Sequence, residues 1–162
     1  MERPTGERQR ARESPAKHTE LAAMRVMVFV KGDPQTEQGA LPPEGLVEKM
    51  TAYNERLVQA GVLLAADGLY PSSKGVRVRF DGPKRTVVDG PFTEAKELVA
   101  GYWLWQVRSL DEAIEWLKQA PFEGGDVEIR PIFESEDFLA EYGNPELAER
   151  EGRLKAAVAE RA

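Results

Sequence analysis

The sequence lacks cysteine altogether and contains a single histidine, His18. Without thiols the chain has no disulfide, no thiolate nucleophile and no thiolate ligand for zinc or an iron–sulfur cluster. Basic residues are also in the minority, with 22 lysines and arginines against 28 aspartates and glutamates. The resulting net charge of −6 argues against a broad basic surface. We therefore expect neither thiol chemistry nor nucleic-acid binding.

Long apolar runs are missing as well. No stretch approaches the roughly 20 apolar residues that cross a bilayer, and the first residues have no apolar core of the kind found in signal peptides. The absence of cysteine also fits a reducing compartment. We expect a cytoplasmic protein that does not bind membranes.

The composition changes abruptly at Met24. Residues 1–23 are rich in arginine and glutamate and have almost no apolar content, so we expect a disordered N-terminal arm. Residues 24–142 are expected to form one domain, because a chain of 162 residues with 41% hydrophobic content can bury a real core. Residues 143–162 are highly charged and favour helix, which predicts an exposed helical tail.

Hydrophobic periodicity predicts elements in the order β-α-β, a hairpin, then β-α-β. Gly61 suits the end of the first helix. Ser109 and Glu112 form a capping box before the second helix, in which Ser109 accepts from the Glu112 amide and the Glu112 carboxylate reaches back. The turn at 81–84 predicts the hairpin. The expected strands are 24–30, 62–66, 75–80, 85–89, 99–107 and 127–133, and the expected helices are 44–60, the segment between Ser109 and Pro121, and 136–142.

Two split βαβ units in this order predict an α+β fold, a ferredoxin-like sandwich with one antiparallel sheet, two helices on one face and an inserted β-hairpin. Strands 24–30 and 99–107 are apolar on both faces, whereas a sheet with one solvated face would alternate. Another layer must therefore cover the second face. A copy of the same sheet is the simplest cover, so we predict a homodimer in which the sheets form an α/β barrel.

Residues 89–97 are the strongest candidate for a site. Gly90 and Pro91 restrict the backbone of this turn, which leads directly into the aromatic strand. The segment contains three carboxylates and one ammonium group, those of Asp89, Glu94, Glu97 and Lys96. Asp89 or Glu94 is suited to act as a general base, and Lys96 and Glu97 are suited to bind a polar ligand.

Structural roles for the same turn are at least as common. Asp89 can accept from the backbone amides of Phe92 or Thr93, and the charged side chains can form a solvated turn without any ligand.

Three further residues are candidates for ligand binding. Arg130 shares a strand face with Glu128 and is suited to clamp an anion, or to form an ion pair with Glu128 or Asp89. We expect Arg130 to lie near the 89–97 turn. Tyr102, beside a glycine, and Tyr53, on the first helix, are suited to line a ligand pocket or to pack in the core.

The sequence contains no motif for a bound metal or cofactor. It has no glycine-rich phosphate loop, no nucleophile elbow and no clustered spacing of metal ligands. We therefore predict no metal and no cofactor.

Several segments, taken in order, resemble the DGPF subgroup of the YCII-related proteins. The resemblance extends from about Met24 to Phe133 and implies a dimeric α+β barrel. Proteins of the DGPF type are often encoded beside extracytoplasmic-function sigma factors, which implies a regulatory or stress-linked setting. The matching segments are 60–62, 68–71, Asp89-Gly90-Pro91-Phe92 with Glu94, Lys96 and Glu97, then Gly101-Tyr102, 110–113 and 128–131.

The resemblance does not transfer a mechanism. Some YCII-related proteins are thought to use a His–Asp pair, but this chain has Met50 and Tyr53 in the corresponding helix and Ala120 before Pro121. We expect a dimeric small-molecule-binding or accessory protein. The alternative is a small-molecule enzyme that uses the carboxylates of the 89–97 turn with Arg130 as anion clamp. A cofactor-free monooxygenase is a third hypothesis, by analogy of fold alone.

Overall fold

The structure is a computed structural model that describes residues 23–94, 97–135, 137 and 143–161. The predicted arm, apart from Ala23, and nearly all of the helical patch predicted at 136–142 lie outside these residues. The elements are β1 (Met24–Lys31), α1 (Pro34–Glu37), α2 (Glu44–Gln59), β2 (Leu63–Gly68), the short 3-10 helix η1 (Ser72–Lys74), β3 (Val76–Asp81), β4 (Lys84–Asp89), β5 (Val99–Val107), α3 (Leu110–Leu117), β6 (Val127–Pro131) and α5 (Pro145–Ala159).

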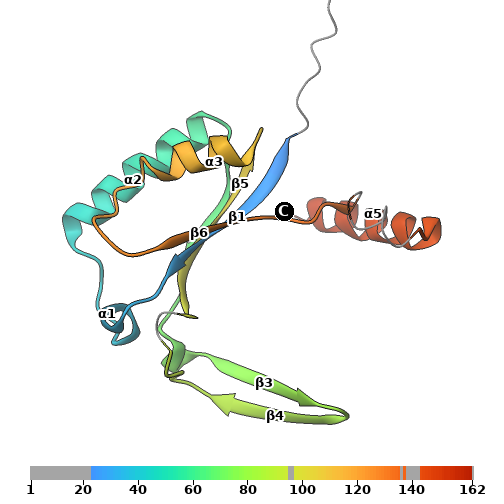
Figure 1. Ribbon diagram of the computed structural model, residues 1–162, viewed down its shortest axis with the longest axis horizontal. Coiled ribbons are helices and arrows are strands. Elements are labelled where there is room, and N and C mark those ends of the chain that lie inside the picture. Colours follow the sequence, from blue (N-terminus) through green and yellow to red (C-terminus); the bar gives the residue numbers. More distant parts are fainter. Residues whose placement is uncertain (1–22, 95–96, 136, 138–142, 162) are drawn as a thin grey trace, which may run out of the picture.

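Four strands form one antiparallel sheet in the order β2-β5-β1-β6. Helices α2 and α3 lie side by side on one face of this sheet (Figure 1). Strands β3 and β4 form a separate two-stranded hairpin. The predicted α+β fold with an inserted hairpin is confirmed.

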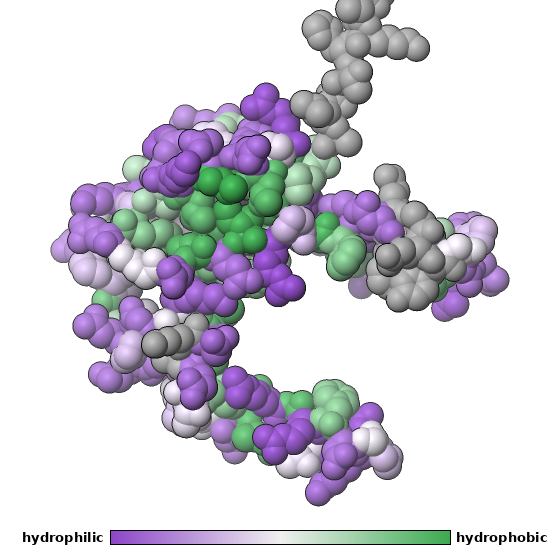
Figure 2. Space-filling view, in the orientation of Figure 1, coloured by the Kyte–Doolittle hydropathy of each residue, from purple (hydrophilic) through white to green (hydrophobic). Residues whose placement is uncertain are grey.

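The core lies between the sheet and the two helices. Val26 is opposite Trp105 and Val28 is opposite Trp103, so these four side chains share the helix-facing surface. All four are buried, and Leu57 of α2 packs onto them. Full burial of such a side chain contributes about 1.5–3 kcal/mol. Figure 2 shows apolar residues gathered between the helix layer and the sheet.

The opposite face of the sheet carries a second apolar set. Met27 pairs with Leu104, and Phe29 pairs with Tyr102, on the side away from α2 and α3. These side chains are partly exposed. Among the described residues no helix packs on this face, which we call the open face.

Two helix starts differ from the sequence analysis. Helix α1 lies in a segment predicted to be a loop, and its capping box joins the Asp33 carboxylate to the Thr36 amide and the Thr36 hydroxyl to the Asp33 amide. At α3, Ser109 accepts from the Glu112 amide as predicted. The Glu112 carboxylate instead accepts from the Arg108 amide at 2.7 Å, one residue earlier than the predicted partner.

The hairpin and α5 project from the body of the molecule toward the same side (Figure 1). Neither packs extensively on another described element. The described helices include none with the length and apolar character needed to cross a membrane.

Candidate ligand-binding cleft

A cleft of ≈ 1390 Å³ lies where β1 ends and β5 begins. Its walls are α1 with the loop to Pro43, the first half of α2, the segment 66–74 and the loop 121–127. In Figure 1 these segments lie on the left of the molecule, around α1 and the lower end of α2. The volume exceeds the roughly 300–1,000 Å³ of a typical small-molecule pocket, so a ligand of ordinary size would fill only part of the cleft.

The floor of the cleft contains an ordered aromatic group. Trp103 is only 4% exposed, and its ring centroid lies 6.0 Å from that of Phe122, with the planes 67° apart. The ring centroids of Trp103 and Trp105 lie 5.7 Å apart. Met50 also lines the cleft. Edge-to-face packing of this kind holds the rings in place, so the cleft has a preformed apolar floor.

Asn54 supplies a polar group at this floor. Its Oδ1 accepts a hydrogen bond of 2.9 Å from the Trp103 indole, which occupies the carbonyl side of the amide. The Nδ2 group then remains as a donor, with no hydrogen bond inside the described part of the chain. Since Asn54 lines the cleft, it is suited to donate to a ligand oxygen.

Tyr53 supports the floor from behind. It is 3% exposed, packs edge-on against Trp103 at 5.9 Å, and donates its hydroxyl to the Trp116 carbonyl at 2.7 Å. Burial raises the pKa of Tyr53 above its ordinary value of 10.0. The side chain does not line the cleft, so the geometry favours its structural role.

Tyr102 lies at the edge of the cleft. Its hydroxyl donates to Asp67 Oδ2 at 2.8 Å, and this bond raises the pKa of Tyr102. Both residues line the cleft. Gly101 beside it leaves room for the neighbouring strand, because a Cβ there would lie 3.1 Å from the Asp67 carbonyl oxygen.

The turn at 89–92 is bonded to the wall of the cleft through Ser72. The Phe92 amide donates to Ser72 Oγ at 2.9 Å. The Ser72 amide and hydroxyl in turn donate to the carboxylate of Glu37, at the end of α1. The Phe92 amide is therefore not capped by Asp89, and this part of the structural alternative for Asp89 is wrong.

Gly90, in the same turn, packs directly against the backbone of Ser72. An added Cβ at Gly90 would lie 1.8 Å from the Ser72 carbonyl oxygen, and the peptide bond to Pro91 is cis. The Gly90 amide donates to the Gly75 carbonyl at 3.0 Å. Because Ser73 and Lys74 of η1 line the cleft, the turn holds part of the cleft wall in place.

The three carboxylate residues of the turn do not line the cleft. Asp89 ends β4 opposite Val76 and is exposed, and Glu94 is exposed and accepts from the Glu97 amide through its carbonyl at 2.9 Å. None of Asp89, Glu94 and Glu97 lines the cleft. Lys96 lies outside the described residues.

Arg130 lies on the open face, as its predicted alternation with Ile129 requires. Its guanidinium is 3.8 Å from Glu128, which also pairs with Lys31 at 2.9 Å. The Lys31 ammonium holds the pKa of Glu128 below its ordinary value. In the described part of one chain, no hydrogen bond or ion pair joins Arg130 to Asp89 or Glu94.

No group of three or more carboxylate or imidazole side chains is arranged to hold a metal ion in the described segments. The arrangement instead offers an apolar surface with a polar rim. Such a cleft suits reversible binding of an organic molecule.

Several residues of the cleft were not singled out by the sequence analysis. Asn54 lies within the helix predicted at 44–60 and Trp103 within the strand predicted at 99–107, and neither position carries a local signal for ligand binding. Phe122 carried no signal, because it follows Pro121 in a loop. The Glu37–Ser72 bond joins residues 35 positions apart, and only the fold reveals it.

Comparison with known proteins identifies the domain. Residues 24–136 match the YCII-related domain family. The chain is also 33% identical over 92 residues to an uncharacterized protein of Rhizobium meliloti (strain 1021). That alignment covers 55% of this chain and 74% of the relative.

Proposed function

The chain belongs to the YCII-related domain family, and we propose that it is a homodimeric small-molecule-binding protein whose ligand occupies the cleft above Trp103. The observation that carries this proposal is the preformed floor. Trp103 is fixed by Tyr53, Phe122 and the Asn54 carbonyl before any ligand binds. Preorganisation of this kind lowers the entropy cost of binding.

The floor and rim favour a ligand with a flat apolar part and a polar end. Met50, Trp103 and Phe122 offer contact to the apolar part. The Asn54 amide offers a donor to an oxygen of the ligand. Lys49, Lys74 and Glu123 also line the cleft, so charges of both signs are available to the polar end of the ligand.

The apolar and charged side chains of the open face support the proposed homodimer. Met27, Phe29 and Leu104 give it an apolar centre, and Lys31 and Glu128 are paired beside that centre. A surface that carries both signs of charge can meet a copy of itself without net repulsion. We further assign the chain to the DGPF subgroup on the Asp89–Phe92 sequence, with an accessory role beside a sigma factor as the setting that this subgroup implies.

Catalysis by carboxylates of the 89–97 turn has less support. Asp89 and Glu94 do not line the cleft, and Arg130 is engaged by Glu128 on a different surface. A general base must lie within hydrogen-bonding reach of its substrate.

A thermal-shift screen against a metabolite library tests the ligand proposal, followed by titration of each hit against the tryptophan fluorescence. A ligand in the cleft raises the melting temperature of the wild type. Lys49→Ala and Asn54→Ala are expected to weaken its binding about tenfold, since each removes one polar contact.

Asp89→Asn and Arg130→Ala are the matched controls, and both should bind the hit as the wild type does. Loss of binding in these two variants, with binding intact in Lys49→Ala and Asn54→Ala, would place the site at the turn and reject the cleft. A library without any stabilising compound would reject small-molecule binding in favour of a partner-binding role.

A further inference from the structure

The hairpin β3–β4 presents an apolar face that the described part of the chain leaves largely exposed, with only the Arg85 guanidinium stacked over Phe80 at 4.4 Å. Val78 is opposite Val87, and Phe80 lies on the same face as both. All three side chains are exposed, Phe80 by 69%. A two-stranded hairpin with a bare apolar face is only marginally stable by itself, so it needs a covering surface.

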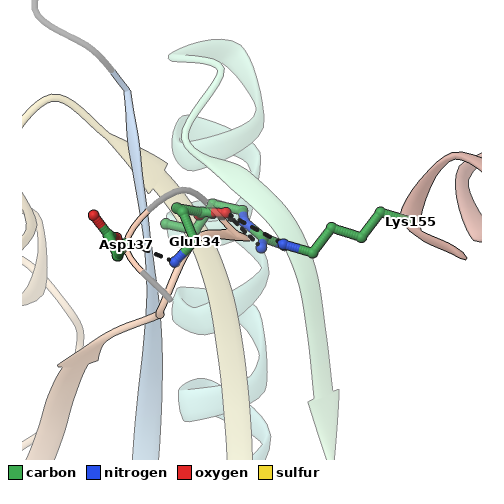
Figure 3. A network of polar contacts seen from close by, with 4 residues as sticks. Glu134, Asp137 and Lys155 are labelled. Carbon is green, nitrogen blue, oxygen red and sulfur yellow. Dashed lines mark hydrogen bonds and ion pairs between the residues drawn. The ribbon is translucent and has the colours of Figure 1, made fainter. Parts of the chain in front are cut away.

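Helix α5 presents a second apolar surface that the described residues leave exposed. Leu154 and Val158, one turn apart, are 62% and 69% exposed. One ion pair links this helix to the body of the molecule, because Lys155 Nζ lies 3.9 Å from Glu134, whose carboxylate accepts two bonds from Arg25 at 2.8 and 3.0 Å (Figure 3). The Glu134 amide also donates to Asp137 in this network.

The hairpin is joined to the body of the molecule by contacts at its base. Arg77 of β3 stacks over the Phe92 ring at 3.8 Å, and the Phe92 amide is bonded to Ser72. Each projection is therefore linked to the body by a specific contact, the hairpin at its base and α5 through Lys155, while the apolar side chains of both stay exposed. This combination is typical of an arm that reaches another molecule.

The two projections leave the sheet at opposite ends of its strands. The hairpin connects to β2 and to the start of β5, where Val99 pairs with Lys31 at the end of β1. Helix α5 follows β6, whose last residue Pro131 pairs with Val26 near the start of β1. Both nevertheless extend to the same side of the molecule (Figure 1).

We propose that the hairpin of one copy packs against α5 of a second copy, with the Val78–Phe80–Val87 face on Leu154 and Val158. This inference rests on the proposed homodimer. A two-fold axis that runs across the strands, between two stacked sheets, brings opposite strand ends together. This axis places the hairpin of each copy beside α5 of the other copy, so the dimer contains two equivalent hairpin–α5 contacts.

The charges of the two projections are compatible with a second copy as the partner. The hairpin carries four basic side chains, those of Arg77, Arg79, Lys84 and Arg85, but only two acidic ones, Asp81 and Asp89. The whole chain has a net charge of −6, so the rest of it is acidic. Helix α5 carries three acidic and three basic side chains, so the hairpin of an identical chain meets it without net repulsion.

Sedimentation of the full chain tests the pairing and the arm separately. The wild type is expected at twice the 18.1 kDa chain mass. Phe80→Ser and Leu154→Ser should each raise the dimer dissociation constant about tenfold or more, because each removes an apolar side chain from the hairpin–α5 contact, which forms twice in the dimer. Arg79→Ser, on the opposite hairpin face, is the matched control and should leave the constant unchanged.

Crosslinking identifies which ends meet, and the absence of cysteine leaves no background reaction. Val78→Cys and Leu154→Cys chains are co-expressed and treated with a flexible bismaleimide. The co-expressed pair should give covalent dimers, and each variant expressed alone should give few.

A monomeric wild type would overturn both the homodimer and the arm. A dimeric wild type in which Val78→Cys alone crosslinks as well as the mixture would overturn the arm only, because hairpins would then meet hairpins. A dimer that Phe80→Ser and Leu154→Ser leave intact would also overturn the arm while the homodimer stands.

Discussion

Gly90 lies directly against the carbonyl oxygen of Ser72. A Cβ at this glycine would lie 1.8 Å from that oxygen, and backbone, unlike the end of a flexible side chain, cannot rotate away. The contact joins the turn after β4 to η1, which in turn is bonded to α1 through Glu37. The turn at 89–92 therefore belongs to the architecture of the cleft wall.

Gly90→Ala is expected to lower the free energy of unfolding by about 2–3 kcal/mol, because the added methyl forces two backbone segments apart. Urea denaturation measures the change. Gly124→Ala is the matched control, since a Cβ at Gly124 meets nothing within 4 Å. Equal stability of the two variants would show that the close approach is absent in solution.

Ser72→Ala is expected to cost about 1–3 kcal/mol. The hydroxyl accepts from the Phe92 amide and donates to Glu37, so its removal leaves the Phe92 amide without its acceptor, while Glu37 keeps only the Ser72 amide. The neighbouring Ser73→Ala is the control, because Ser73 is exposed and makes no side-chain hydrogen bond within the described residues. A Ser73→Ala effect as large as that of Ser72→Ala would contradict the assignment.

Alkaline pH should destabilise the protein through Tyr53. Burial raises the pKa of Tyr53 in the folded state, whereas the unfolded chain ionises near the ordinary value of 10.0. The stability from this group is thus complete below pH 10 and decreases as the pH rises further, by at most about 1.4 kcal/mol per pH unit. Tyr53→Phe should be less stable at neutral pH, since the Trp116 carbonyl loses its donor, and should show a flatter decline above pH 10. If Tyr53→Phe loses stability above pH 10 as steeply as the wild type, groups other than Tyr53 cause that loss.

Acidic pH should weaken the ion pairs that Glu134 forms with Arg25 of β1 and Lys155 of α5. The hydrogen bonds from Arg25 hold the pKa of Glu134 below its ordinary value of 4.5. The stability from this pair is present above that value and is lost as the pH falls below it. Because both side chains are about one-third exposed, the contribution is at most about 1 kcal/mol. Thermal melts of Glu134→Gln should differ from the wild type at pH 6 and converge with it toward pH 3, and a constant difference would contradict this.

Local patterns in the sequence predicted most of the elements. The hairpin at β3–β4, strand β5 and helix α2 follow from short-range signals, namely turn residues, alternation and a period of about 3.6. Helix α1 was missed because it is only four residues long and its signal is a single capping box at Asp33. The ends of β2 and β6 differ from the prediction by two residues, where pairing with β5 and β1 sets the limits.

Local sequence patterns predicted the restricted turn at 89–97 but not the residues that form the cleft. The 89–97 turn was prominent because its residue types are restrictive, and the structure explains the restriction at Gly90 by a contact with Ser72. The cleft depends instead on Asn54, Trp103 and Phe122, which come from a helix, a strand and a loop.

The sequence by itself determined the fold class, the two-sided apolar strands and the absence of thiol chemistry, because these depend on composition and on neighbours a few residues apart. Only the tertiary structure decided that Ser72 links the turn to Glu37 and that Asn54 accepts from Trp103. Hydrogen bonds and close contacts between residues far apart in the chain depend on how the elements pack, and no local pattern encodes that packing.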